Sequence, residues 1–111
     1  MESPKPRRVV YTTAAIATLI EFDRFSVSAI LMCIDTTFSD ARELNVNTRR
    51  IDAQRKIYAS HVLCGSVPVF WKYLEKEDVM EVIAIGIPID TKADEIEKIA
   101  QKSFENLRVC G

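Results

Sequence analysis

Basic side chains crowd the stretch from residue 49 to residue 56, where charge and hydrogen-bond donors could engage a nucleic acid. Arginine and lysine bind phosphates through charge, and arginine and glutamine also read base edges. Two more arginines lie in a polar arm at residues 1–8. The candidate nucleic-acid-binding residues are Arg7, Arg8, Arg49, Arg50, Gln54, Arg55 and Lys56. The alternative is a solvated helix face with Asp52 and Lys56 paired four residues apart. The net charge of −1 favours that alternative, because nucleic-acid-binding domains are usually basic.

Two aspartates, Asp35 and Asp90, stand in the same tripeptide, Ile-Asp-Thr. An aspartate at the start of a helix accepts hydrogen bonds from the free amides of the first turn, so both are predicted to be helix caps. If the two tripeptides occupied equivalent positions about a pseudo-two-fold axis, the two aspartates could also face each other. Paired carboxylates do so when they hold a divalent ion or share a proton. Capping is the simpler interpretation of both residues.

Four aromatic residues are candidates for an interface or a small apolar pocket: Tyr11, Phe70, Trp71 and Tyr73. Aromatic residues at alternate strand positions are also typical of a core. His61 and Cys64 could offer two metal ligands from one helix face, but no second pair is near, so no metal and no cofactor is expected. Three glycines supply no phosphate-binding loop, and no nucleophile has a recognisable base. We therefore expect no catalytic residues and favour a non-enzymatic protein.

The chain contains signs of an internal duplication. Residues 19–36 align without a gap on residues 74–91, and the identical pairs are Leu19/Leu74, Asp23/Asp78, Val27/Val82, Ala29/Ala84, Ile30/Ile85, Ile34/Ile89, Asp35/Asp90 and Thr36/Thr91. The aligned halves run from about 10 to 64 and from 65 to 111, inside a predicted single domain 1–111. Two unrelated junctions that share an aspartate are the alternative.

The second half of the repeat has the clearer elements. Residues 67–87 alternate β-branched and aromatic residues around a charged turn, which predicts a hairpin. Residues 92–108 place apolar side chains on one face and predict an amphipathic helix. The repeat then predicts a first hairpin that turns near Asp23, although 13–34 taken alone also supports two helices. A second helix is predicted at 48–63.

These elements give the order ββαββα, a duplicated ββα unit. The predicted fold class is α+β, a two-layer sandwich with a four-stranded antiparallel sheet and two main helices. The alternative is a winged helix, with helices at 13–22 and 26–37, a recognition helix at 48–63 and a wing at 67–87. The acidic tip of that wing, around Glu75, Glu77 and Asp78, counts against it.

The predicted sheet has large apolar residues on both faces, so we expect a second subunit to cover one of them and make a homodimer. The function that follows is a small binding or regulatory protein that self-associates through its sheet and engages a protein or small-ligand partner. The alternative is a nucleic-acid-binding regulator that uses the basic helix 48–63. Unpaired cysteines and a polar start predict a cytoplasmic protein, and charges at 21–24 interrupt the apolar run that a membrane span would need.

Overall fold

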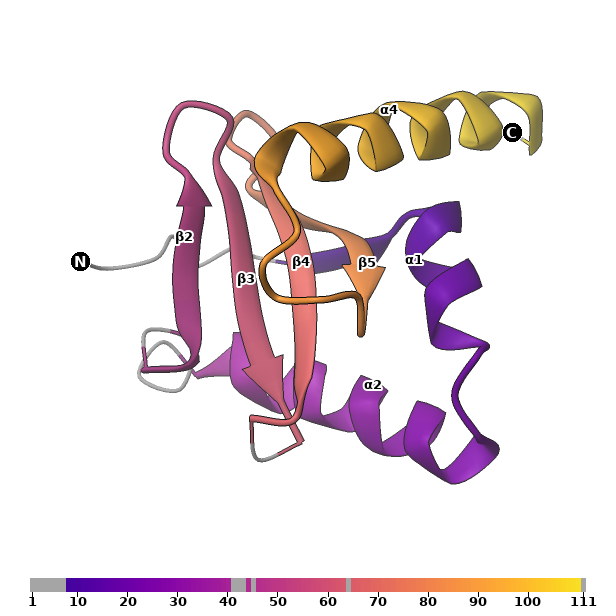
Figure 1. Ribbon diagram of the computed structural model, residues 1–111, viewed down its shortest axis with the longest axis vertical. Coiled ribbons are helices and arrows are strands. Elements are labelled where there is room, and N and C mark those ends of the chain that lie inside the picture. The colour runs from indigo at the N-terminus through magenta and orange to yellow at the C-terminus, as the bar shows by residue number, and fades with distance from the viewer. Residues whose placement is uncertain (1–7, 41–43, 45, 64, 111) are drawn as a thin grey trace.

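The computed structural model describes residues 8–40, 44, 46–63 and 65–110, with side chains up to residue 102. Figure 1 shows a twisted sheet with helices on both sides. The elements, in chain order, are β1 (Arg8–Tyr11), α1 (Thr13–Leu19), α2 (Arg24–Ser39), β2 (Thr48–Asp52), β3 (Ile57–Val62), β4 (Val67–Leu74), β5 (Val79–Ile85) and α4 (Ala93–Cys110). The α+β class is therefore confirmed, with three helices and five strands in the described residues.

The sheet is mixed, with the strand order β1-β5-β4-β3-β2. Strands β2 to β5 form an antiparallel meander, because short turns join each strand to the next. Strand β1 adds to the far edge, parallel to β5, and the two helices α1 and α2 make the connection from β1 to β2. A bulge interrupts the β4–β5 pairing between Phe70 and Trp71.

One face of the sheet is covered by α1 and α2. The buried side chains on this side are Ala15, Leu19, Ile30, Ile34, Phe38, Leu44, Val62, Val67, Val69, Trp71, Met80, Val82 and Ile85. Trp71 lies at the centre, stacked on Tyr58 with ring centroids 4.6 Å apart and met edge-on by Phe38 at 5.6 Å. Because this one face buries so many large side chains, it forms the principal core of the described chain.

The opposite face of the sheet is covered by α4 (Figure 1). Its buried side chains are Ile57, Ala59, Phe70, Ile83, Ala84, Ile96 and Ala100. The two-layer prediction was therefore wrong, since the chain covers both sheet faces itself. The physical reason is that every central strand carries apolar residues on both sides, and each side needs its own cover.

Capping side chains define where the first two helices begin. Thr12 Oγ1 accepts a hydrogen bond from the Ala15 amide at 3.0 Å and donates to the Val82 carbonyl at 2.9 Å, which ties α1 to β5. Asp23 Oδ1 accepts from the Ser26 amide at 2.9 Å at the start of α2. The pair Asp23-Arg24 is therefore a helix start, and the hairpin predicted near Asp23 was wrong.

The predictions for the second half of the chain agree with the structure. Residues 67–87 contain the antiparallel strands β4 and β5, and the predicted helix 92–108 corresponds to α4. The first half differs, because 13–36 forms two helices and the predicted helix 48–63 is the hairpin of β2 and β3. The winged-helix alternative predicted the first two helices at about the right positions. Its recognition helix at 48–63 is absent, because these residues form β2 and β3. The aligned segments 19–36 and 74–91 thus have different secondary structures, and the ββαββα order was wrong.

Candidate functional site

The β2–β3 hairpin carries most of the predicted basic residues. Arg49 and Arg50 are exposed on β2, at one edge of the sheet, and neighbouring strand residues point to opposite faces. Arg49 pairs in register with Ala59, which packs under α4, so Arg49 shares the α4 face. Gln54 is exposed in the turn that follows. The structure therefore gathers this part of the predicted set on one edge of the sheet.

Lys56 and Arg8 lie in different surroundings. Lys56 has a positive φ of 56° in the β2–β3 turn, and its Nζ lies 2.5 Å from Glu75 Oε2, in the turn between β4 and β5. Arg8 is exposed on β1, the opposite edge of the sheet from β2. Arg7 lies outside the described residues. The predicted basic residues are therefore divided between the two edges of the sheet.

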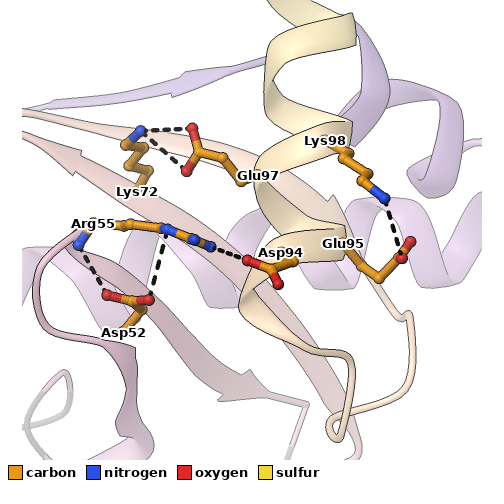
Figure 2. Close-up of polar contacts among 7 residues, drawn as sticks. All are labelled: Asp52, Arg55, Lys72, Asp94, Glu95, Glu97 and Lys98. Carbon is orange, nitrogen blue, oxygen red and sulfur yellow. Dashed lines mark hydrogen bonds and ion pairs between the residues drawn. The ribbon is translucent and has the colours of Figure 1, made fainter.

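Arg55 connects the β2–β3 turn to α4 (Figure 2). Its backbone amide donates to Asp52 Oδ1 at 3.0 Å, which holds the turn, and its Nη1 lies 2.8 Å from Asp94 Oδ1. The hydrogen bond to Asp94 raises the pKa of the Arg55 guanidinium, so this group stays charged. Asp94 lies in the first turn of α4, where an acidic residue also complements the helix dipole.

Lys72 of β4 makes the second connection to α4. Its Nζ donates to both carboxylate oxygens of Glu97, at 3.1 Å and 3.3 Å, and both side chains are largely buried (Figure 2). Glu95 and Lys98 form a looser pair on the exposed side of α4, at 3.9 Å. Figure 2 thus shows the acidic start of α4 beside two cations, Lys72 of β4 and Arg55 of the β2–β3 turn.

Glu81 of β5 belongs to the same region. It pairs in register with Lys72, so the two side chains project from the same face of the sheet. Burial raises the pKa of the Glu81 carboxyl above its ordinary value, and the charges of Glu97 and Glu77 act in the same direction while Lys72 opposes them. A carboxyl with a raised pKa beside a cation is suited to accept a proton.

The region around α4 therefore combines cations with a proton acceptor. We call Arg55, Lys72, Glu81, Asp94 and Glu97 the α4 cluster. Sequence reasoning named only Arg55 of these residues. The sequence did contain a sign of Lys72 and Glu81, because each is the single charged residue of an otherwise apolar strand. A charged residue in such a strand needs a charged partner or a function.

A second candidate region is an open, mostly apolar pocket of about 450 Å³ between α2 and the end of β3. Its lining residues are Met32, Cys33, Thr36, Thr37, Asn47, His61, Val62 and Leu63. His61 is thus on a strand, and the predicted helix that would carry both His61 and Cys64 does not exist; Cys64 itself lies outside the described residues. No three potential metal ligands gather anywhere in the described part of the chain.

Asp35 and Asp90 do not form a symmetric pair. Asp35 lies inside α2, near its end, and Asp23 is the residue that caps this helix. Burial and then the charge of Asp35 raise the pKa of Tyr11. Asp90 is exposed in the loop before α4, on the other side of the sheet. The shared tripeptide therefore occupies two unrelated positions, and the prediction that Asp35 caps a helix was wrong.

The four predicted aromatic residues serve the chain's own packing. Trp71 and Phe70 are fully buried on opposite faces of β4, and Tyr11 packs against the core under α2. The Tyr73 hydroxyl donates to Asp78 Oδ1 at 2.5 Å. Since Phe70 and Trp71 are covered by this chain's helices, neither is available to a second subunit.

Two solved structures resemble this fold. A chain of the toxin–antitoxin complex RelBE2 from Mycobacterium tuberculosis matches with a TM-score of 0.56 and 12% identity, over 75% of this chain and 99% of that chain. The E. coli toxin RelE, solved as a mutant in the free state, matches with a TM-score of 0.56 and 10% identity, over 91% and 97%. No family model and no curated protein matches the chain by sequence. The chain therefore has a RelE-like toxin fold.

The fold corrects the predicted function. A regulator that self-associates through its sheet needs a free sheet face, and α2 and α4 cover both. The alternative regulator needs a basic helix at 48–63, where the structure has β2 and β3. Neither prediction named the fold that the chain shares with the solved RelE structures. Within the described residues, no helix has the length and apolar character that crossing a bilayer demands.

Proposed function

We propose that this chain acts as a RelE-type toxin, an endonuclease that cuts mRNA on the ribosome and is held inactive by an antitoxin protein. The observation that carries the proposal is the fold likeness over nearly the whole length of both chains, 91% of this one and 97% of E. coli RelE. One fold can serve several functions, so the residues of the site have to support the same activity.

The charges on the sheet support an RNA substrate. Arg49, Arg50 and Gln54 are exposed on the β2 edge and in its turn, with Arg55 and Lys56 beside them. Exposed cations on either side of this edge can bind RNA phosphates, and the arginines and the glutamine can also contact bases. We assign RNA contact to these five residues, with Arg8 at the other edge of the sheet. Such an enzyme works in the cytoplasm, where ribosomes and mRNA are.

The test is cleavage of mRNA on ribosomes. The purified chain is added to translating ribosomes, and primer extension then maps new 5′ ends. Cuts on the ribosome that are far weaker on free RNA are expected, and no cuts on either substrate would reject the proposal. The double variant Arg49→Ala/Arg50→Ala should lower cleavage at least 10-fold and reduce the salt dependence of binding. Arg24→Ala, on the exposed start of α2, is the matched control and should cleave like the wild type.

An antitoxin partner completes the proposal. The similar chain from M. tuberculosis is part of a toxin–antitoxin complex, and on that likeness we propose a protein partner for this chain. Expression of the chain alone should arrest growth, and co-expression of its antitoxin should restore growth and yield a stable complex by light scattering. The homodimer stays a prediction that the same light-scattering measurement tests, although the sheet faces are closed to it.

A further inference from the structure

A bulge in the sheet decides which residue lies beside Lys72. On one side of the bulge Phe70 pairs with Ala84, and on the other Trp71 pairs with Val82, so Ile83 is the extra residue. Without that extra residue, the pairing would place Val82 opposite Lys72. The bulge instead places Glu81 there. Bulges that redirect one side chain are frequent beside active sites.

The pair lies close together and is partly open to solvent. Directly opposite residues of an antiparallel pair have Cβ atoms about 4.5–5.5 Å apart. Lys72 is 27% exposed, and Val10, the β1 residue opposite Glu81, is 37% exposed. The site is therefore partly open to solvent rather than sealed.

The charges around Glu81 come from each neighbouring element. Lys72 lies on β4, Glu97 on α4, Glu77 in the β4–β5 turn and Arg8 on the same face of β1. Among the described residues, no hydrogen bond or ion pair connects the Glu81 carboxylate to a cation, since Lys72 Nζ contacts Glu97. Lys72 has three N–H donors, so it can hold Glu97 and a phosphate oxygen together. Glu81 keeps its lone pairs for a proton.

We propose, on the basis of the proposed function, that Glu81 and Lys72 are catalytic residues of RNA cleavage. The Glu81 carboxylate takes the proton of a ribose 2′-hydroxyl, and the 2′ oxygen forms a bond to the adjacent phosphorus. The bond from phosphorus to the 5′ oxygen breaks, and that oxygen takes a proton from water. The hydroxide left by that water takes the proton held by Glu81, which restores the carboxylate. The products are a 2′,3′-cyclic phosphate and a 5′-hydroxyl. Lys72 donates to a non-bridging phosphate oxygen and stabilises its growing negative charge.

A purely structural role for the same residues predicts different results. If Lys72, Glu81 and Glu97 only hold α4 in place, their loss lowers stability and leaves the chemistry of the folded enzyme unchanged. Kinetic and pH measurements on folded protein therefore separate the two roles.

The experiment measures kcat and KM for cleavage of ribosome-bound mRNA by the wild type and by Glu81→Gln. The glutamine keeps the shape and cannot act as the base, so a loss of at least 100-fold in kcat with little change in KM is expected. Glu21→Gln, an exposed residue between α1 and α2, is the control and should cleave like the wild type. Near-normal cleavage by Glu81→Gln overturns the inference while leaving the proposed function intact. No cleavage by the wild type overturns both.

Two measurements on the wild type keep the inference testable if Glu81→Gln does not fold. The rate should fall tenfold per pH unit on the acid side of an ionisation above the ordinary glutamate pKa of 4.5, because protonated Glu81 is no base. A 2′-deoxy nucleotide at the cut position should block cleavage. A rate that stays flat toward acid pH, or cleavage of the deoxy substrate, contradicts the assignment.

Discussion

The indole Nε1 of Trp71 donates a hydrogen bond to Ser60 Oγ at 2.9 Å, and both side chains are fully buried. Ser60 Oγ also lies 2.6 Å from Thr48 Oγ1, so one hydroxyl connects β4, β3 and the edge strand β2. A buried donor without a partner is costly, so the serine lets the sheet keep a tryptophan at its centre.

Ser60→Ala should therefore destabilise the protein by about 1–3 kcal/mol, because the indole N–H and the Thr48 hydroxyl both lose this partner. Urea unfolding followed by tryptophan fluorescence measures the change. Ser28→Ala, at an exposed position of α2, is the control and should stay within about 0.5 kcal/mol of the wild type. Equal stability of both variants would show that the hydrogen bond contributes nothing.

Gly86 and Gly65 form a matched pair for a test of backbone packing. Both have φ of +83°, which costs a residue with a side chain about 1–2 kcal/mol. A Cβ at Gly86 would also meet Phe22 Cζ at 2.6 Å, whereas a Cβ at Gly65 meets nothing within 4 Å. Gly86→Ala should therefore destabilise the protein by about 1–3 kcal/mol more than Gly65→Ala, because only the alanine at 86 overpacks its surroundings. Thermal unfolding of the two variants measures the difference. A Gly65→Ala cost as large as that of Gly86→Ala would contradict the clash.

The Lys72–Glu97 pair should couple more strongly than a surface pair. Its side chains are 27% and 22% exposed, while those of Lys98 and Glu95 are 75% and 63% exposed. Exposed pairs typically contribute about 0.2–1 kcal/mol, and water screens the partly buried pair less. One double-mutant cycle combines Lys72→Met with Glu97→Gln, and a second combines Lys98→Met with Glu95→Gln. Urea unfolding of each variant gives the free energies from which the two coupling energies are calculated. A larger coupling energy for Lys98–Glu95 than for Lys72–Glu97 would contradict this prediction.

Asp23 should make α2 sensitive to acid. Its pKa lies below the ordinary value of 3.8, first because the Ser26 amide donates to its carboxylate and then because the Ser26 hydroxyl does. A lowered pKa contributes stability that is complete above pH 3.8 and disappears as pH falls through the lower folded value. Asp23→Asn keeps the cap at neutral pH and should flatten the acid limb of Tm against pH. An unchanged acid limb in this variant would refute the linkage.

Parts of the fold follow from local sequence. The residues of β4 and β5 are largely β-branched and aromatic, and a turn with charged residues separates them. This pattern predicts a β-hairpin. The spacing of apolar residues in 92–108 likewise predicts α4, because its period matches a helix face. The abundance of large apolar residues on both sides of the central strands predicted that both faces need a cover. It did not predict that α2 and α4 provide it.

The β2–β3 hairpin shows where local sequence was insufficient. The turn around Ala53, Gln54, Arg55 and Lys56 consists of good helix formers, so local preference favoured a helix. The strands form because Ile57 and Ala59 pack under α4 while Tyr58 and Ser60 face Trp71, and both partners are distant in sequence. Tertiary packing outweighs a preference of a few tenths of a kcal/mol per residue.

The α4 cluster was decided by tertiary structure alone. The sequence by itself determined the residue types, namely a basic stretch at 49–56, single charges in apolar strands and an acidic start of the last helix. Only the fold brings Arg55 to Asp94 and Lys72 to Glu97, and only the bulge at Ile83 sets Glu81 opposite Lys72. A shift of one residue in strand register moves a side chain to the other face, and no local pattern in this sequence announces that shift.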